Sequence, residues 1–183
     1  MALVDITPAG FDVGLDLRYA TADNLTGRPI YRAPVCLLHV DAAARLMLAV
    51  DLARGQGLRL VIFDAFRPVE AQWRLWEALP DPRYIADPRE GSSHSRGIAV
   101  DLTLADAEGR ALDLGTPFDD MTEQSHHGRL DIPAETQRHR AILLGIMAAA
   151  GWQHYSYEWW HYQLPDGRRY PLLSDGAAGA LMM

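Results

Sequence analysis

The 183-residue chain contains no lysine, so all 17 of its basic residues are arginines. They are outnumbered by 24 acidic residues, which leaves a formal net charge of −7, and no run of basic residues occurs. We therefore expect no nucleic-acid binding, because phosphate neutralisation by basic side chains supplies most of that affinity. A permanently charged side-chain cation in this protein can only be a guanidinium.

Cysteine and long apolar runs are equally scarce. The single cysteine, Cys36, cannot form an internal disulfide and excludes a multi-cysteine zinc site. It lies in the apolar run Val35–Leu38, where we expect it to be buried. No apolar stretch reaches the ~18 residues of a membrane span, and the amino terminus lacks a basic segment followed by an apolar one. We therefore expect a cytoplasmic protein with no membrane contact.

The length fits one domain, which we expect to span residues 1–183, with a core at about 11–164 and a tail of undetermined structure at 165–183. Hydrophobic periodicity and turn residues predict an α+β fold. The predicted helices cover residues 41–54, 69–79 and 133–150, the first capped by Asp41. The predicted strands cover residues 11–19, 58–65, 97–104, 111–114 and 153–164. A proline-rich loop at 80–92 is long enough to suggest a functional role.

Two segments place acids and histidines in apolar surroundings. In the first, SSHSRGIAVD, His94 lies at the mouth of a predicted strand and Asp101 follows seven residues later. In the second, EWWHY, Glu158 and His161 stand within a strongly apolar run. Buried carboxylates and imidazoles cost several kcal/mol unless a partner compensates them, which a divalent metal would do for all of them at once.

A metal site built from these segments has a definite chemistry. His94, Asp101 and His161 would supply two nitrogens and one oxygen, leaving a fourth tetrahedral position for water, as in catalytic zinc sites. Other first-row metals would also fit, and Glu158 would be free to act as a general base. The alternative is two ordinary hydrogen-bonded acid–histidine pairs. Because Glu158 and His161 point to opposite faces of a regular strand, the metal interpretation requires a bulge or a strand end there.

Four separated segments, in this order, resemble the D-alanyl-D-alanine dipeptidases of the VanX type, which are zinc peptidases of family M15. They are YATADNLTG (19–27), FDAFRP (63–68), SSHSRGIAVDLTL (92–104) and EWWHY (158–162). The last two are similar to the zinc motifs SxHxxGxAxD and ExWH of that family. The resemblance runs from about residue 11 to about residue 164. It implies a zinc D,D-peptidase (hedgehog-like) fold, with a central, mostly antiparallel sheet and flanking helices.

The resemblance also implies roles for single residues. It assigns one Zn²⁺ per chain to His94, Asp101 and His161, and it makes Glu158 the catalytic base and proton shuttle. Arg67, which follows the predicted buried strand at 58–65, would stabilise the tetrahedral transition state. That role is chemically reasonable, because a developing oxyanion needs a fixed positive donor and a guanidinium is always charged.

Two further residues are implied to bind substrate. Ser92 matches a family serine near the substrate, and Asp119 matches the acid that receives the amino terminus of the dipeptide. Asp120 and Glu123 are close enough in the chain to be alternatives, as is a solvated acidic loop without a role. The loop at 80–92 is shorter than in the family and the tail ends differently. If that loop forms a wall of the pocket, the protein would admit dipeptides other than D-Ala-D-Ala.

The activity that the resemblance implies is hydrolysis of the small dipeptide D-Ala-D-Ala into two D-alanines, either in recycling of wall-derived dipeptide or in glycopeptide resistance. One alternative is a D,D-carboxypeptidase on longer muropeptides, against which the lack of an export signal argues. Another is a non-catalytic zinc-binding or cell-wall-binding module, which would need neither Glu158 nor Arg67. The oligomeric state is not determined by the sequence.

Overall fold

The structure, a computed structural model, describes residues 3–183. Its strands are β1 (Leu3–Asp5), β2 (Gly14–Leu15), β3 (Leu37–His39), β4 (Arg59–Asp64), β5 (Ala99–Ala105), β6 (Gln153–Tyr155) and β7 (Glu158–Gln163). Its α-helices are α1 (Pro8–Phe11), α2 (Val40–Arg54), α3 (Val69–Ala78), α4 (Ala134–Ala149) and α5 (Asp175–Ala178). No helix within residues 3–183 combines the length and the apolar character needed to cross a membrane.

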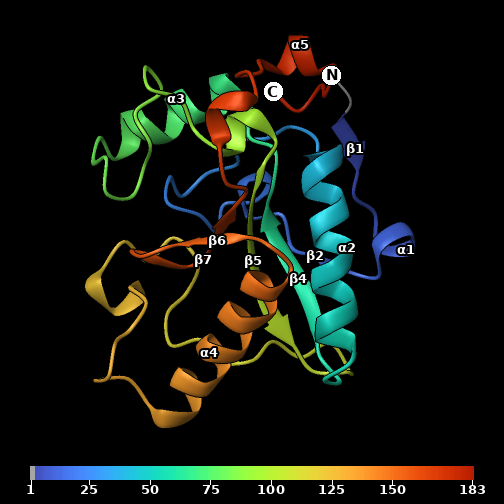
Figure 1. The fold of residues 1–183 in the computed structure, drawn as a ribbon. Coiled ribbons are helices and arrows are strands. Elements are labelled where there is room, and N and C mark those ends of the chain that lie inside the picture. The colour runs from blue at the N-terminus through green and yellow to red at the C-terminus, as the bar shows by residue number, and fades with distance from the viewer. Residues whose placement is uncertain (1–2) are drawn as a thin grey trace.

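A five-stranded sheet in the order β2-β4-β5-β7-β6 forms the centre of the molecule (Figure 1). Only the β2–β4 pair is parallel, and the other three pairs are antiparallel. Strands β1 and β3 form a separate antiparallel pair. The predicted α+β class with a mostly antiparallel central sheet is therefore confirmed.

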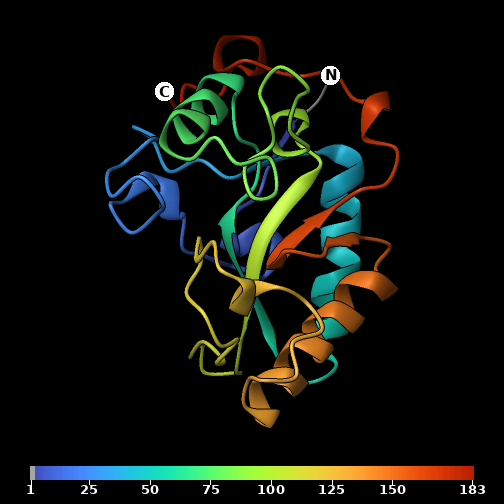
Figure 2. The same ribbon diagram turned by 90° about the vertical axis from the view of Figure 1, so that its left-hand side faces the viewer.

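The two long helices lie together on one side of the central sheet. Figure 2 shows α2 and α4 on that side, while α3 and long loops lie on the other. Side chains of β5 alternate accordingly: Val100, Leu102 and Leu104 join the core beneath the helices, and Asp101 lies outside that cluster. Because successive side chains of a strand point to opposite faces, one strand supplies both the core and the polar face.

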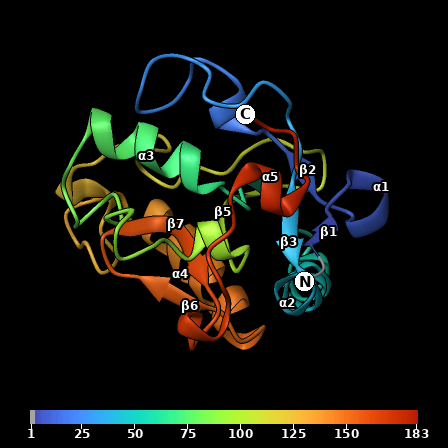
Figure 3. The same ribbon diagram turned by 90° about the horizontal axis from the view of Figure 1, so that it is seen from above.

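A second apolar cluster lies beneath α3 and the chain end, and the predicted tail is part of it. Its members include Tyr31, Phe66, Leu75 and the fully buried Met182. The Met182 carbonyl accepts a hydrogen bond of 2.7 Å from the Arg32 backbone N–H. Figure 3 shows α5 and the carboxyl end on the same side of the molecule as β3. The tail of undetermined structure in the sequence interpretation is thus a docked segment.

The helices begin and end close to their predicted bounds. The first cap differs: α2 begins at Val40, and the His39 ring accepts a hydrogen bond of 3.2 Å from the Asp41 backbone N–H. His39 is therefore the N-cap, and Asp41 lies in the first turn, where a carboxylate favours the helix dipole. At the end of α4, Gly151 adopts a φ of 87°, the left-handed conformation that favours glycine after a helix.

The predicted strand at 11–19 is wrong in its backbone conformation. The segment contains the end of α1, the two-residue β2 and a short 3-10 turn. Thr7 caps α1 with its hydroxyl and Pro8 lies in the first turn, both of which favour a helix. The alternation of apolar and polar residues in this segment nevertheless indicates which side chains face inward, since Val13, Leu17 and Tyr19 are all buried.

Two other strand predictions also need correction. The segment 153–164 is a hairpin, because residues 156–157 form a turn between β6 and β7. The segment 111–114 is not a strand and contributes one isolated bridge, between Ala105 and Ala111. The loop at 80–92 contains neither helix nor strand, as predicted.

Candidate active site

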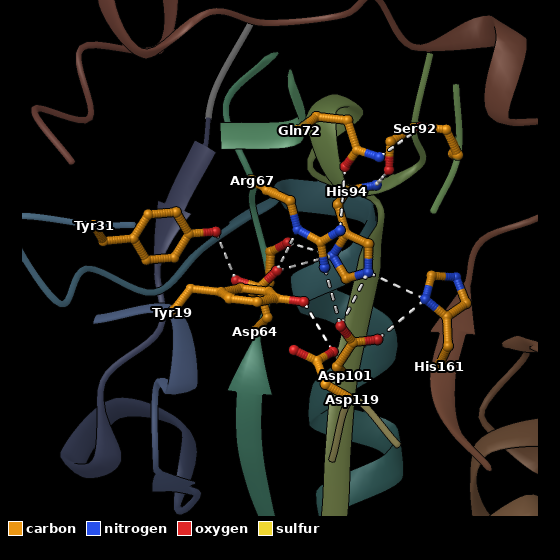
Figure 4. A network of polar contacts seen from close by, with 12 residues as sticks. Tyr19, Tyr31, Asp64, Arg67, Gln72, Ser92, His94, Asp101, Asp119 and His161 are labelled. Carbon is orange, nitrogen blue, oxygen red and sulfur yellow. Dashed lines mark hydrogen bonds and ion pairs between the residues drawn. The ribbon is translucent and has the colours of Figure 1, made fainter. Parts of the chain in front are cut away.

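A row of polar side chains crosses the sheet on the face away from α2 and α4. Asp64 of β4 is paired with Asp101 of β5, and Asp101 is paired with His161 of β7. Residues directly opposite each other in antiparallel strands place their side chains on one face, so these three lie side by side. His94 joins them from the 3-10 turn that precedes β5 (Figure 4).

The three predicted metal ligands converge. His94 Nε2 lies 3.1 Å from His161 Nδ1 and 3.3 Å from Asp101 Oδ2, and His161 Nδ1 lies 3.1 Å from Asp101 Oδ1. Zinc–nitrogen and zinc–oxygen bonds of about 2.0–2.2 Å in a tetrahedron separate neighbouring donor atoms by about 3.3 Å. The spacing of these donors therefore fits one zinc ion.

The outer ring nitrogens strengthen this fit. His94 Nδ1–H donates to the Ala65 carbonyl at 2.7 Å, and His161 Nε2–H donates to Gln163 Oε1 at 3.1 Å. Each neutral imidazole carries one ring proton, so Nε2 of His94 and Nδ1 of His161 present lone pairs to each other and to Asp101. Three converging lone pairs need a cation, and outer hydrogen bonds of this kind hold metal-binding histidines in orientation.

The electrostatics of Asp101 favour its charged form. Burial alone would raise the pKa of this carboxyl, but positive charge and hydrogen bonds from His94 and His161, when these rings are protonated in the absence of metal, outweigh burial and hold the pKa well below its usual range. Arg67 Nη2 also donates to Asp101 Oδ2, at 3.3 Å. Asp101 is thus ionised at neutral pH and available to a metal.

Glu158 lies beside the ligands although it is only three residues from His161. Its Oε2 is 3.9 Å from His161 Nδ1, and both residues line the same pocket. Pairing between β6 and β7 shifts between His154 and Tyr155, which supplies the irregularity that the metal interpretation requires at this strand end. Burial, and then the charges of Asp101 and Asp119, raise the pKa of Glu158 well above its usual range. A carboxyl with a raised pKa beside a metal site suits proton transfer.

Arg67 is buried and held from three directions. Its Nε donates to Asp64 at 2.8 Å, its Nη1 to Gln72 at 3.1 Å and its Nη2 to Asp101 at 3.3 Å. The guanidinium also lies over the Tyr19 ring, 4.9 Å from its centroid. A guanidinium has five N–H donors, so one on each terminal nitrogen remains for a ligand in the pocket that Arg67 lines.

Of the acids in the loop after Gly115, Asp119 is the one that reaches the pocket. Its carboxylate accepts hydrogen bonds from the Tyr19 hydroxyl at 3.0 Å and the Leu25 backbone N–H at 2.9 Å. Burial raises the pKa of Asp119 to about 7, against the opposing effect of the Leu25 hydrogen bond. Asp120 and Glu123 do not line the pocket.

Ser92 is buried at the pocket wall. Its hydroxyl accepts a hydrogen bond of 3.2 Å from the backbone N–H of His94. This contact gives Ser92 a structural role in addition to the predicted substrate contact, because it fixes the turn that carries His94.

Several residues of the pocket and of the hydrogen-bond network around Arg67 carry no role in the sequence interpretation. They are Tyr19, Asp64, Gln72 and Gln163. The sequence does contain a signal for Asp64, since this carboxylate lies at the end of an apolar strand and within the segment FDAFRP. Tyr19 likewise begins the segment YATADNLTG, whereas Gln72 and Gln163 have ordinary local surroundings and their position becomes evident only in three dimensions.

Comparison with known proteins addresses the family directly. Residues 1–174 match the family described as D-ala-D-ala dipeptidase, in peptidase family M15. The chain belongs to this dipeptidase family. Its membership confirms both the resemblance and the expected class of enzyme, a peptidase.

Named D-alanyl-D-alanine dipeptidases are similar over most of their length. The Escherichia coli (strain K12) protein is 48% identical over 173 residues, 94% of this chain and 90% of its own. The Enterococcus faecium protein is 35% identical over 175 residues, 82% of this chain and 85% of its own. The Streptomyces coelicolor protein is 33% identical over 189 residues, 90% of this chain and 91% of its own.

Among solved structures, a variant of the vancomycin-resistance D,D-pentapeptidase VanY in complex with Zn(II) also matches this member of the dipeptidase family. It has a TM-score of 0.47 and 16% sequence identity, and the match covers 88% of this chain and 83% of that chain.

Proposed function

We propose that the protein hydrolyses D-Ala-D-Ala into two D-alanines, with one zinc ion held by His94, Asp101 and His161. The observation that carries the proposal is the convergence of the His94, Asp101 and His161 side chains, in which each ring nitrogen lies 3.1–3.3 Å from a carboxylate oxygen of Asp101 and 3.1 Å from the other ring nitrogen. The adjacent acid and guanidinium, Glu158 and Arg67, distinguish a hydrolytic site from a simple metal-binding site.

Each side chain has a separate task in this reaction. Zinc, when bound, would polarise the scissile carbonyl and make water a stronger nucleophile. The Glu158 carboxylate accepts the proton that the attacking water loses and then donates it to the nitrogen of the leaving D-alanine. The free N–H groups of Arg67 donate to the oxygen on which negative charge develops, and they need no reorganisation because the guanidinium is already fixed.

The amino terminus of the substrate is assigned to Asp119. In its ionised form this carboxylate would pair with the ammonium of the dipeptide, at a site where Tyr19 and Leu25 fix its orientation. An acylated nitrogen would leave the Asp119 charge without a partner, which discriminates against longer or N-blocked peptides. Either dipeptide recycling or glycopeptide resistance would use this same reaction.

Amine release from D-Ala-D-Ala and from N-acetyl-D-Ala-D-Ala by the zinc-loaded protein tests the proposal. We expect rapid hydrolysis of the free dipeptide and little hydrolysis of the acetylated one. Efficient cleavage of the acetylated peptide would instead favour a D,D-carboxypeptidase. Stoichiometric zinc without hydrolysis of either peptide would leave a binding module as the better description.

A further inference from the structure

Gln72 is a buried, uncharged side chain between the catalytic face and a pocket loop, and the proposed reaction does not use it. Only 1% of its surface is exposed. Its Oε1 accepts a hydrogen bond of 3.1 Å from Arg67 Nη1, and its Nε2 donates one of 2.7 Å to the Ala86 carbonyl. Figure 4 shows Gln72 beside the guanidinium of Arg67.

The start of α3 explains how Gln72 reaches both partners. Pro68 is the N-cap of α3, and the Gln72 backbone N–H donates to the Pro68 carbonyl at 3.1 Å in the first turn. The helix therefore turns Gln72 back over Arg67, five residues earlier. An amide suits this place because it both accepts and donates without carrying a charge.

The loop that Gln72 holds is a wall of the pocket. Pro82, Tyr84, Ile85 and Ala86 of the loop at 80–92 all line the pocket. The Tyr155 hydroxyl of β6 also holds this loop by donating to the Arg83 carbonyl at 2.7 Å. Among residues 3–183, Gln72 is the side chain that is hydrogen-bonded both to this loop and to Arg67.

We infer that Gln72 is a positioning residue, which fixes the Arg67 guanidinium in the pocket and ties that position to the loop wall at 82–86. The inference rests on the proposed function, in which Arg67 donates to the developing oxyanion. The Gln72 amide therefore supports two stages of the reaction. Its hydrogen bond to Arg67 supports the rate of the chemical step, and its hydrogen bond to Ala86 supports binding of the dipeptide.

Two variants of the zinc-loaded protein separate these hydrogen bonds. In Gln72→Glu a carboxylate still accepts from Arg67 but no longer donates to Ala86. In Gln72→Met a side chain of similar length does neither. We expect Gln72→Met to lose about 10²-fold in kcat, the cost of a misplaced catalytic donor, and to raise KM for D-Ala-D-Ala. Gln72→Glu should raise KM similarly while keeping kcat within about 3-fold of wild type, because its hydrogen bond to Arg67 remains.

Gln137 offers a matched control. Its Nε2 also donates to loop carbonyls, those of Leu130 and Ile132 at 3.2 and 2.9 Å, but it does not line the pocket. Gln137→Met should therefore leave both kcat and KM unchanged. Zinc content and the melting temperature establish that each variant is folded and loaded.

The outcomes separate this inference from the proposed function. No hydrolysis by the wild-type protein contradicts the proposed function itself. Hydrolysis by wild type with an unchanged kcat in Gln72→Met, or an equal loss of kcat in both variants, overturns the inference about Gln72 alone.

If Gln72→Met does not fold, hydrogen exchange in Gln72→Glu, together with its kcat, still tests the inference about Gln72. Faster exchange at the Tyr84 and Ile85 amides, which donate to the Asp81 carbonyl, with kcat retained, supports the inference. Unchanged exchange with a lost kcat overturns it.

Discussion

Three charged side chains of the candidate site, Asp64, Arg67 and Asp101, are each no more than 6% exposed. Their charges are stable there only because every one has a hydrogen-bonded partner of opposite sign. The same contacts leave little freedom to the guanidinium. At the scale of residues, then, the interactions that make buried charge tolerable also fix the guanidinium to which we assign oxyanion stabilisation.

Asp119 makes a pH dependence testable at the residue scale. Burial places its pKa at about 7, so lower pH protonates it and removes the charge that the substrate ammonium needs. We expect kcat/KM for D-Ala-D-Ala to rise with pH, with the midpoint of the rise near pH 7. It should fall again above about 8, as the α-amino group of the substrate loses its proton.

The variant Asp119→Asn provides the check on this assignment. It should lower kcat/KM at pH 8 by at least about 10-fold, since an ion pair with the ammonium is lost, and it should remove the rise centred near pH 7. An acid limb with the same midpoint in Asp119→Asn and wild type would contradict a titrating Asp119.

At the scale of elements, the docked tail makes a prediction about stability. Met182 is fully buried in the cluster beneath α3, and Asp175 accepts a hydrogen bond of 2.8 Å from its backbone N–H. We expect Met182→Ala to lower the free energy of unfolding by about 2–4 kcal/mol, through lost apolar burial and a cavity. Urea denaturation measures the loss. The exposed Leu181 is the matched control, and Leu181→Ala should change stability by less than about 0.5 kcal/mol.

The elements that the sequence predicts best are those with local signals. Helices α2, α3 and α4 carry long periodic patterns, prolines at their starts or glycines after their ends. Strands β1 and β3 are three residues each and exist because they pair across more than thirty residues of chain. No local pattern predicts such a pairing, and neither strand was predicted from the sequence.

The residues of the candidate site likewise divide into those with a local sequence signal and those without one. The sequence identifies His94, Asp101 and His161 because polar ligands stand out in apolar segments, and the structure brings all three together. Gln72 and Tyr19 are not identified, because their partners Ala86 and Asp119 lie 14 and 100 residues further along the chain. Contacts of that kind depend on the complete fold, which a spacing pattern does not describe.

At the scale of the whole molecule, metal binding should couple to stability. The proposed zinc ligands come from β5, β7 and the turn before β5, which are apart in the unfolded chain. A ligand at about 100 times its Kd stabilises the folded state by about 2.7 kcal/mol, so zinc should raise the melting temperature and a chelator should reverse the gain. The variant His161→Ala should show no zinc-dependent shift. Equal melting temperatures of wild type with and without zinc would contradict the metal site.

In the proposed mechanism Glu158 transfers the proton at a zinc site that does not need it as a ligand. The most direct measurement compares D-alanine release from D-Ala-D-Ala by zinc-loaded wild type and Glu158→Gln, with zinc content measured on the same samples. We expect one zinc per chain in both proteins and a rate lower by about 10²–10⁴-fold in the variant. Near-normal turnover by Glu158→Gln, with its zinc retained, would contradict this mechanism.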